Sequence, residues 1–147
     1  TKSLGEIESS NFYSFRCSLV GRELNSSYSL LSWFLNQKEE VIGYNNIYWN
    51  GLAVTELAKI YERIVINNLL PKTNSHNIVP AGPVTKHYLL QLFNVFYKKD
   101  IIVRSRFSES PSSRILTTLD KEYNTSIFGG KIKTIEEMIR EMAVFKL

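Results

Sequence analysis

The sequence predicts an α+β fold of the winged-helix class, in which a helix-turn-helix core carries a β-hairpin wing, with an extra N-terminal strand and a C-terminal helix. Two observations on residues 83–120 carry this prediction. A helix capped by Thr85 is indicated by apolar side chains at i, i+3, i+4 and i+7, namely Leu89, Leu92, Phe93 and Phe96. The pattern of residues then changes to that of a β-strand at 101–107. A polar turn at 109–113 follows and leads to a second strand at 114–119.

The elements predicted before residue 83 rest on the same two patterns, the spacing of apolar residues in a helix and their alternation in a strand. Apolar residues alternate with polar ones over 13–19, which indicates a half-buried strand. Apolar stripes predict helices over 27–39 and 56–68, the second capped by Thr55, with a short extended piece at 41–49 between them. Residues 71–83 are rich in proline and asparagine and read as a loop, ordered by Ile78 and Val79 turning inward.

The segment after the predicted wing is expected to contain one more turn and one more helix. Gly129 and Gly130 mark a turn within 123–133 that leads to a short strand. Thr134 and Glu137 have the spacing of a capping box. The helix that this box opens has its apolar stripe at Ile135, Met138, Ile139 and Met142.

Length and composition bound the class of protein. The 147 residues, 44% of them hydrophobic, are expected to form one domain over 1–147, with 1–11 as a loose lead-in. The chain starts at Thr1 without methionine, so we expect a fragment of a larger protein. Cys17 is the only cysteine, which excludes an internal disulfide and a thiolate metal cluster and fits a reducing compartment. No stretch is long and apolar enough to predict a membrane span.

The sequence offers no catalytic motif. His76 falls in the proline-rich loop and His87 in the first turn of a predicted helix, and neither has the spacing of a metal or nucleophile site. The Gly129-Gly130-Lys131 run lacks the frame of a phosphate-binding loop. We therefore predict a protein that is not an enzyme and that uses no cofactor and no metal ion.

A binding function is therefore the remaining alternative, and the helix predicted over 85–98 has two candidate binding surfaces. Its polar strip and the basic residues of the wing would suit duplex DNA, through His87, Gln91, Asn94, Lys98, Arg104, Arg106 and Arg114. Large apolar residues flank that strip and would suit a protein partner, through Tyr88, Leu90, Val95 and Tyr97. The width of the apolar arc favours protein contact over DNA contact, and plain burial in the core is the third alternative.

The order of segments resembles the C-terminal winged-helix domain of the origin-recognition and replication-licensing ATPases. The resemblance covers about residues 28–143 and is carried by SLLSWFL, ELAKIYERIVINNLLP, TKHYLLQLFNVFYKKDIIVRSR, RILTTLD and IEEMIREM. Two positions depart from the family pattern. Asp100 stands where the family has glycine, and the predicted wing tip at 108–113 is acidic and rich in serine.

The family includes a budding-yeast silencing paralogue of the largest origin-recognition subunit, whose winged-helix domain is a homodimerising module of heterochromatin. This resemblance implies a nuclear protein whose partners are a second copy of itself and chromatin or silencing-complex proteins, and which acts in transcriptional silencing. The alternative that it implies is a DNA-binding winged helix of an origin-recognition ATPase in replication initiation. No membrane partner is expected.

Overall fold

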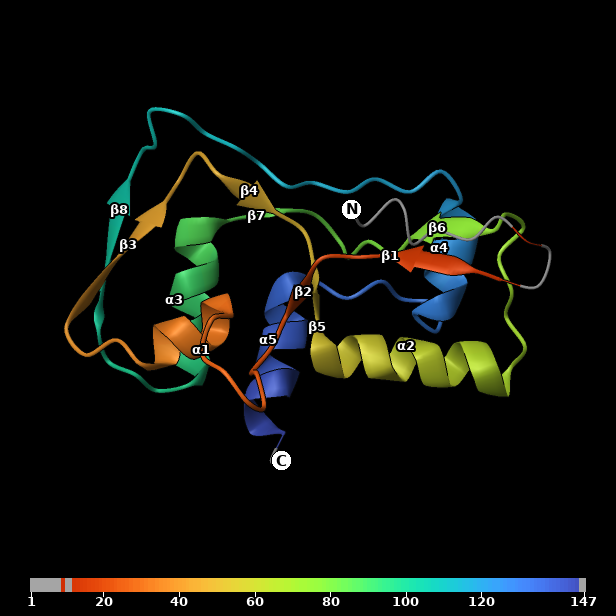
Figure 1. Ribbon diagram of the computed structural model, residues 1–147, viewed down its shortest axis with the longest axis horizontal. Helices are drawn as coiled ribbons and strands as arrows, with labels where there is room; N and C mark the ends of the chain where they lie inside the picture. Colours follow the sequence, from red (N-terminus) through yellow and green to blue (C-terminus); the bar gives the residue numbers. More distant parts are fainter. Residues whose placement is uncertain (1–8, 10–11, 146–147) are drawn as a thin grey trace.

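A computed structural model of the chain describes Ser9 and residues 12–145, and the predicted lead-in at 1–11 lies almost wholly outside these residues. The described elements alternate short strands with helices (Figure 1). In chain order they are β1 (Ser14–Arg16), β2 (Leu19–Val20), α1 (Leu30–Leu35), β3 (Glu40–Tyr44), β4 (Tyr48–Trp49), β5 (Leu52–Ala53), α2 (Val54–Ile66), β6 (Ser75–Asn77), β7 (Val84–Thr85), α3 (Lys86–Phe96), β8 (Ile102–Arg106), α4 (Lys121–Ile127) and α5 (Ile135–Val144).

The strands of the described chain form four two-stranded pairs, three of them parallel. β1 pairs with β6, β2 with β5, and β3 with β8, all in parallel, while β4 and β7 are antiparallel. The longest ladder runs from the Glu40–Ile102 pair to the Tyr44–Arg106 pair. Parallel partners need long crossover connections, and here the connections contain helices, as is typical of α/β proteins.

The prediction of a winged helix is wrong, because the predicted wing does not exist. Strand β8 begins close to where the sequence predicts, but its hydrogen bonds go to β3, about 60 residues earlier in the chain. Within the described residues, the segment at 114–119 contributes only an isolated bridge between Arg114 and Trp49. The alternation of residues over 101–107 predicts an extended backbone, but it does not predict which other strand pairs with it. The prediction that 101–107 pairs with 114–119 in a hairpin was therefore wrong.

Local signals placed the starts of α3 and α5 correctly. The Thr85 hydroxyl accepts the Tyr88 N–H and opens α3, as predicted. The capping box of Thr134 and Glu137 opens α5, also as predicted. Helix α2 is an exception: it follows β5 directly with Ala53 at its N-cap and no side-chain cap, two residues before the predicted cap Thr55.

Two further predictions need correction. The predicted helix over 27–39 is only the six residues of α1, whose first turn is capped by the Ser29 hydroxyl. The predicted turn at Gly129 and Gly130 is present, but it follows helix α4, which was not predicted, is capped by Asp120 and buries Tyr123 and Ile127. The short strand predicted after this turn is not found among the described residues. The predicted loop at 71–83 contains the short strand β6, and Ile78 and Val79 are buried there as predicted.

One hydrophobic core runs through the molecule, between two groups of elements seen at either end of Figure 1. At one end α3 packs on β3, β8 and α1, where the Phe34 and Phe93 rings lie 5.7 Å apart. At the other end α2 packs on α4, close to the β1–β6 pair. Helix α5 contacts both α2 and α3 and joins the two groups. None of the described helices is long and apolar enough to cross a membrane.

A buried ionic cluster ties α2 to α5. The Glu56 carboxylate, 1% exposed, accepts a hydrogen bond from Lys133 Nζ at 2.8 Å, and the same Nζ donates to Glu141 at 2.8 Å. Arg63 Nη1 lies 3.8 Å from the other Glu56 oxygen, which has no hydrogen-bond partner among the described residues. Burial tends to lower the pKa of Lys133, and hydrogen bonds to Glu141 and Glu56 outweigh it and raise that pKa.

Candidate functional site

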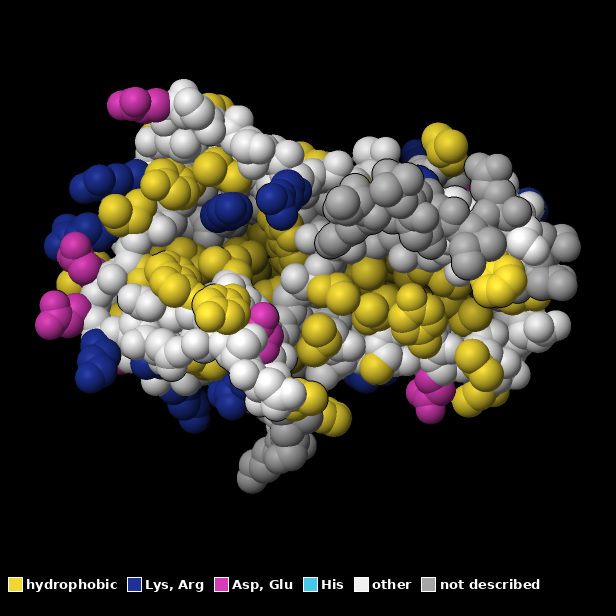
Figure 2. Space-filling view, viewed as in Figure 1, with side chains coloured by type: hydrophobic (Ala, Val, Ile, Leu, Met, Phe, Trp, Pro, Cys, Tyr) yellow, Lys and Arg dark blue, Asp and Glu magenta, His cyan; other side chains and the backbone are white. Residues whose placement is uncertain are grey.

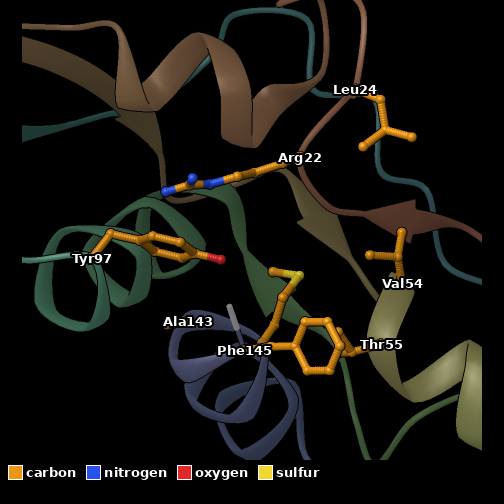
Figure 3. Close-up of a pocket in the computed structure, with 8 residues that line it drawn as sticks. Arg22, Leu24, Val54, Thr55, Tyr97, Ala143 and Phe145 are labelled. Carbon is orange, nitrogen blue, oxygen red and sulfur yellow. The ribbon is translucent and has the colours of Figure 1, made fainter. Parts of the chain in front are cut away.

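A cavity of about 650 Å³ opens between the segment after β2, the start of α2 and the ends of α3 and α5 (Figure 3). Its walls combine one cation with apolar and aromatic groups. The lining residues are Arg22, Leu24, Val54, Thr55, Tyr97, Met142, Ala143 and Phe145. A single charged side chain in a mainly apolar cavity is the usual composition of a small-molecule site.

The cavity lies beyond the carboxyl ends of a parallel strand pair. Strands β2 and β5 run side by side in the same direction, with Val20 in register with Ala53. Arg22 follows the end of β2, and Val54 follows the end of β5 and starts helix α2. In α/β proteins ligands bind in the crevice outside the carboxyl ends of parallel strands, so this cavity is the candidate ligand site.

The segment that carries Arg22 is held by close packing and by hydrogen bonds. A Cβ atom on Gly21 would lie 2.5 Å from Val54 Cγ2, so only glycine lets the chain pass the start of α2 at this distance. The Ser29 hydroxyl donates to the Gly21 carbonyl oxygen at 3.0 Å, and the Ser29 amide donates to Glu23 at 2.8 Å. That amide hydrogen bond is the main reason why the pKa of Glu23 is lowered.

The Arg22 side chain runs along one side of the cavity toward an aromatic ring. Its guanidinium carbon lies 5.5 Å from the centre of the Tyr97 ring, a cation–π arrangement, and Figure 3 shows the Tyr97 hydroxyl turned toward the cavity. Burial raises the pKa of Tyr97, and the charge of Arg22 opposes the rise. Among the described residues Arg22 has no carboxylate partner and donates no hydrogen bond. Its five N–H groups are therefore available to an anionic ligand.

The opposite wall is apolar and comes from the end of α5. Met142 is buried there, and the Phe145 ring lies next to Thr55 in Figure 3. Leu24 and Val54 stand at the edge of the cavity and are exposed. The arrangement suits a ligand with an anionic part for Arg22 and a flat or apolar part for this wall.

The residues predicted to contact nucleic acid are spread over several structural roles. Asn94 accepts the Ile101 N–H at 3.1 Å and donates to the Ile101 carbonyl at 2.9 Å, so it closes the turn after α3. Lys98 lies beyond the end of α3 with φ +52°, and Arg104 pairs with Glu40 at 2.6 Å. The remaining members are His87, which packs against Gly43, and the exposed Gln91, Arg106 and Arg114.

Of the residues predicted to form a protein interface, Tyr88 and Val95 line a second cavity, of about 500 Å³, together with Gln91 and Asn94. Leu90 is 3% exposed and belongs to the core, while Val95 is 67% exposed. The Tyr88 hydroxyl donates to Glu136 at 2.9 Å. Of the sequence-predicted residues only Tyr97 lines the first cavity, and it was selected for a different role. Arg22 was missed because nothing local distinguishes it from other exposed arginines; its place just past the end of a predicted strand was the one available signal.

Comparison with known proteins identifies the class of fold. No protein-family model matches the chain, and no curated protein matches it. Solved structures with a Rossmann-like fold do match, among them reductases and an epimerase named for nucleotide-linked sugars, one of them in complex with NADP. At these identities the likeness shows the fold alone.

Three of the matching structures illustrate the likeness. A dTDP-4-dehydrorhamnose reductase from Clostridium acetobutylicum is 12% identical over 88% of this chain and 47% of its own, with a TM-score of 0.65. A reductase of the same name from Bacillus anthracis, in complex with NADP, is 14% identical over 84% and 44%, with a TM-score of 0.59. A UDP-N-acetylglucosamine 4-epimerase from Methanobrevibacter ruminantium, in complex with UDP-N-acetylmuramic acid, is 17% identical over 88% and 44%, with a TM-score of 0.57. The chain spans less than half the length of each.

These matches overturn the functional reading of the sequence. The resemblance to origin-recognition ATPases is wrong, and with it the homodimerising silent-chromatin module and the DNA-binding alternative in replication. The segment pattern matched because helices and strands of similar length recur in both folds, while the pairing of the strands differs. The expectation of a protein without enzymatic function is also at odds with the matches, since each is an enzyme.

Proposed function

We infer that this chain is the substrate-binding part of an NAD(P)-dependent enzyme that reduces or epimerises the sugar of a nucleoside-diphosphate sugar. The observation that carries the inference is the cavity at the carboxyl ends of β2 and β5, lined by the guanidinium of Arg22, which has no carboxylate partner among the described residues. The fold shared with reductases and an epimerase of sugar nucleotides supports the choice of substrate class.

The residues of this chain do not fit the dinucleotide cofactor itself. No two glycines of the sequence are separated by a single residue, so the G-x-G-x-x-G turn that holds a pyrophosphate is missing. Gly129 and Gly130, with φ of +79° and +92°, follow the end of α4 and do not lead from a strand into a helix. Strand β5 passes into α2 without an intervening loop. A part other than this chain therefore has to hold the NAD(P).

Within the cavity different residues would bind different parts of the ligand. The guanidinium of Arg22 can donate two parallel hydrogen bonds to the oxygens of a phosphate, a geometry that a lysine ammonium cannot supply. Tyr97 holds that guanidinium over its ring and offers a hydroxyl toward the cavity. Met142 and Phe145 provide the apolar surface against which a base or a sugar ring packs.

Calorimetric titration with UDP and with dTDP tests the proposal. We expect either nucleotide to bind the protein, and Arg22→Gln to weaken binding by about 10- to 100-fold, because a hydrogen bond to a charged group contributes about 1.5–3 kcal/mol. Arg22→Lys should recover only part of the affinity. Arg106→Gln, which removes an exposed arginine of β8 outside the cavity, is the matched control and should bind like wild type. Unchanged affinity in Arg22→Gln would refute this function for the cavity.

A further inference from the structure

The second cavity, of about 500 Å³, lies between α3, the start of α5 and strand β8. Its apolar wall contains Leu92, Val95 and Phe96 of α3, together with Val103 of β8. Val95 is 67% exposed, so the packing of the described chain leaves much of this wall uncovered. The lining includes no residue of β3, so the cavity lies on the side of β8 away from its partner strand. We name this cavity together with β8 the α3–β8 groove.

The backbone of β8 has free hydrogen-bonding groups on this side. The Ile102 N–H and the Arg106 carbonyl, at the two ends of β8, are hydrogen-bonded to the residues that flank β3, at 3.0 and 2.9 Å. Peptide groups alternate in direction along a strand, so the N–H and C=O of Val103 and Ser105 point away from β3. None of these four groups bonds to another residue of the described chain. Figure 1 shows β8 at the outer end of the molecule, where another strand has room to pair with it.

The groove is held in shape by hydrogen bonds at its end and along its α5 side. Asn94 accepts the Ile101 N–H and donates to the Ile101 carbonyl, which fixes the end of α3 against the start of β8. On the other side the Glu136 carboxylate accepts hydrogen bonds from the Tyr88 hydroxyl at 2.9 Å and from Arg140 at 2.8 Å. Because these polar groups bond within the chain, a partner meets apolar side chains and the free backbone of β8. A groove formed in advance also lowers the cost of ordering on binding.

Basic side chains lie beside the free edge of β8. Successive side chains of a strand point to opposite faces, so Ile102, Arg104 and Arg106 share the face opposite to Val103 and the cavity. Arg104 pairs with Glu40, whereas Arg106 has no carboxylate partner in the part of the chain that the structure describes. Figure 2 shows several Lys and Arg side chains at the end of the molecule where Figure 1 places β8. Opposite charges on neighbouring strands attract and like charges repel, so this edge favours an acidic strand over a basic one.

We propose that the α3–β8 groove binds an extended segment of another protein as a third strand beside β8, and that acidic residues alternate with apolar ones in this segment. The free peptide groups of Val103 and Ser105 supply the main-chain hydrogen bonds by which a segment joins a sheet edge. Apolar side chains of the segment enter the cavity next to Val95, and acidic side chains lie beside Arg106. The proposal is independent of the nucleotide site, because the two cavities share no lining residue.

Fluorescence anisotropy of a labelled peptide tests strand addition to the full-length protein. The probe is a short synthetic peptide in which glutamate and valine alternate, and the same peptide with lysine in place of glutamate is the charge control. Ser105→Pro removes an N–H that points away from β3, so the pairing of β3 with β8 is kept while an added strand loses its bond. Ser105→Ala keeps that N–H and is the matched control.

We expect the glutamate–valine peptide to bind wild type and Ser105→Ala alike. It should bind Ser105→Pro at least about 10-fold more weakly, because a main-chain hydrogen bond is lost and the proline ring projects toward the added strand. The lysine–valine peptide should bind wild type about 10-fold more weakly than the glutamate–valine peptide, because its charges repel the arginines of β8.

A second pair of variants tests the cavity wall and leaves the strand unchanged. Val95→Glu places a negative charge in the apolar wall, and Val65→Glu places one on α2, at a position that lines neither cavity. The native side chains are similarly exposed, at 67% and 77%, so neither change disturbs the core. We expect Val95→Glu to weaken binding of the glutamate–valine peptide by at least about 10-fold, and Val65→Glu to leave it unchanged.

Several results would overturn the proposal. Wild-type protein that does not bind the glutamate–valine peptide, or that binds the lysine–valine peptide as tightly, contradicts the acidic strand. Binding that either Ser105→Pro or Val95→Glu leaves unchanged means that the peptide attaches elsewhere. A wild-type dimer in sedimentation that Ser105→Pro dissociates means that a second copy of the chain occupies the edge. If Ser105→Pro has a lower urea midpoint than Ser105→Ala, the comparison of Val95→Glu with Val65→Glu decides the test.

Discussion

The buried ionic cluster between α2 and α5 allows a quantitative prediction. Replacing Lys133 with methionine keeps an unbranched side chain, one atom shorter, and removes its three hydrogen bonds, one to Glu56 and two to the oxygens of Glu141. The Glu56 carboxylate, 1% exposed, is then left with only the Arg63 guanidinium at 3.8 Å. Removing one partner of a buried ion pair costs about 3–5 kcal/mol, and the remaining Arg63 places Lys133→Met at the lower end, about 3 kcal/mol.

Urea unfolding at pH 7 measures this loss, and two further variants make the result decisive. Lys131→Met removes a pair of similar length to Glu137, but Lys131 is 80% exposed, so this control should lose less than about 1 kcal/mol. Glu56→Gln combined with Lys133→Met removes the uncompensated charge and should recover part of the loss. If Lys133→Met is no less stable than Lys131→Met, or if the double variant is less stable than Lys133→Met alone, the assignment of a buried, mutually dependent pair is wrong.

Three other predictions concern stability. Burial lowers the pKa of His76 below the ordinary histidine value of 6.5. As the pH falls, His76 therefore takes up a proton in the unfolded chain before it does so in the folded one. The contribution of His76 to stability should be complete above pH 6.5 and fall as the pH drops below it. His76→Phe should reduce this pH dependence of the urea midpoints, measured from pH 7.5 to 5.5. Asn50→Ala removes both hydrogen bonds between the buried Asn50 amide and the Leu116 backbone, and should cost about 2 kcal/mol and speed proteolytic cleavage within 107–119. Gly51→Ala would press a Cβ against the Ser18 carbonyl oxygen and should lower the free energy of unfolding by about 1–3 kcal/mol, whereas an unchanged thermal midpoint would contradict this contact.

Short-range signals in the sequence were reliable where one side chain decides the outcome. The hydroxyl of Thr85 and the reciprocal bonds of Thr134 and Glu137 define helix starts within a few residues of chain, so α3 and α5 begin where predicted. Helix α4 was missed because its seven residues carry only Tyr123 and Ile127 as a spaced apolar pair, too short a stripe to establish a period. Its Asp120 cap was the signal that could have identified it.

The candidate site depends on contacts between distant segments and could not be derived in the same way. Arg22 and Tyr97 are 75 positions apart, and they meet because α3 and the segment after β2 fold onto the same cavity. The sequence predicts that Tyr97 is an aromatic residue beside the polar strip of its helix. It does not predict which residues of other elements lie around Tyr97. A local pattern specifies which way a side chain points from its element, and it does not specify what it meets there.

The sequence by itself determined the positions of most helices and strands, the absence of a glycine-rich dinucleotide loop, and the single cysteine that rules out internal disulfides. Only the tertiary structure decided that β8 lies parallel to β3 and not in a hairpin, and this pairing distinguishes the α/β fold of the chain from a winged helix. The physical reason is that backbone hydrogen bonds in a sheet are made by groups common to nearly all residues. The period of a strand therefore fixes its faces, while the choice of its neighbour is settled by packing of the whole chain.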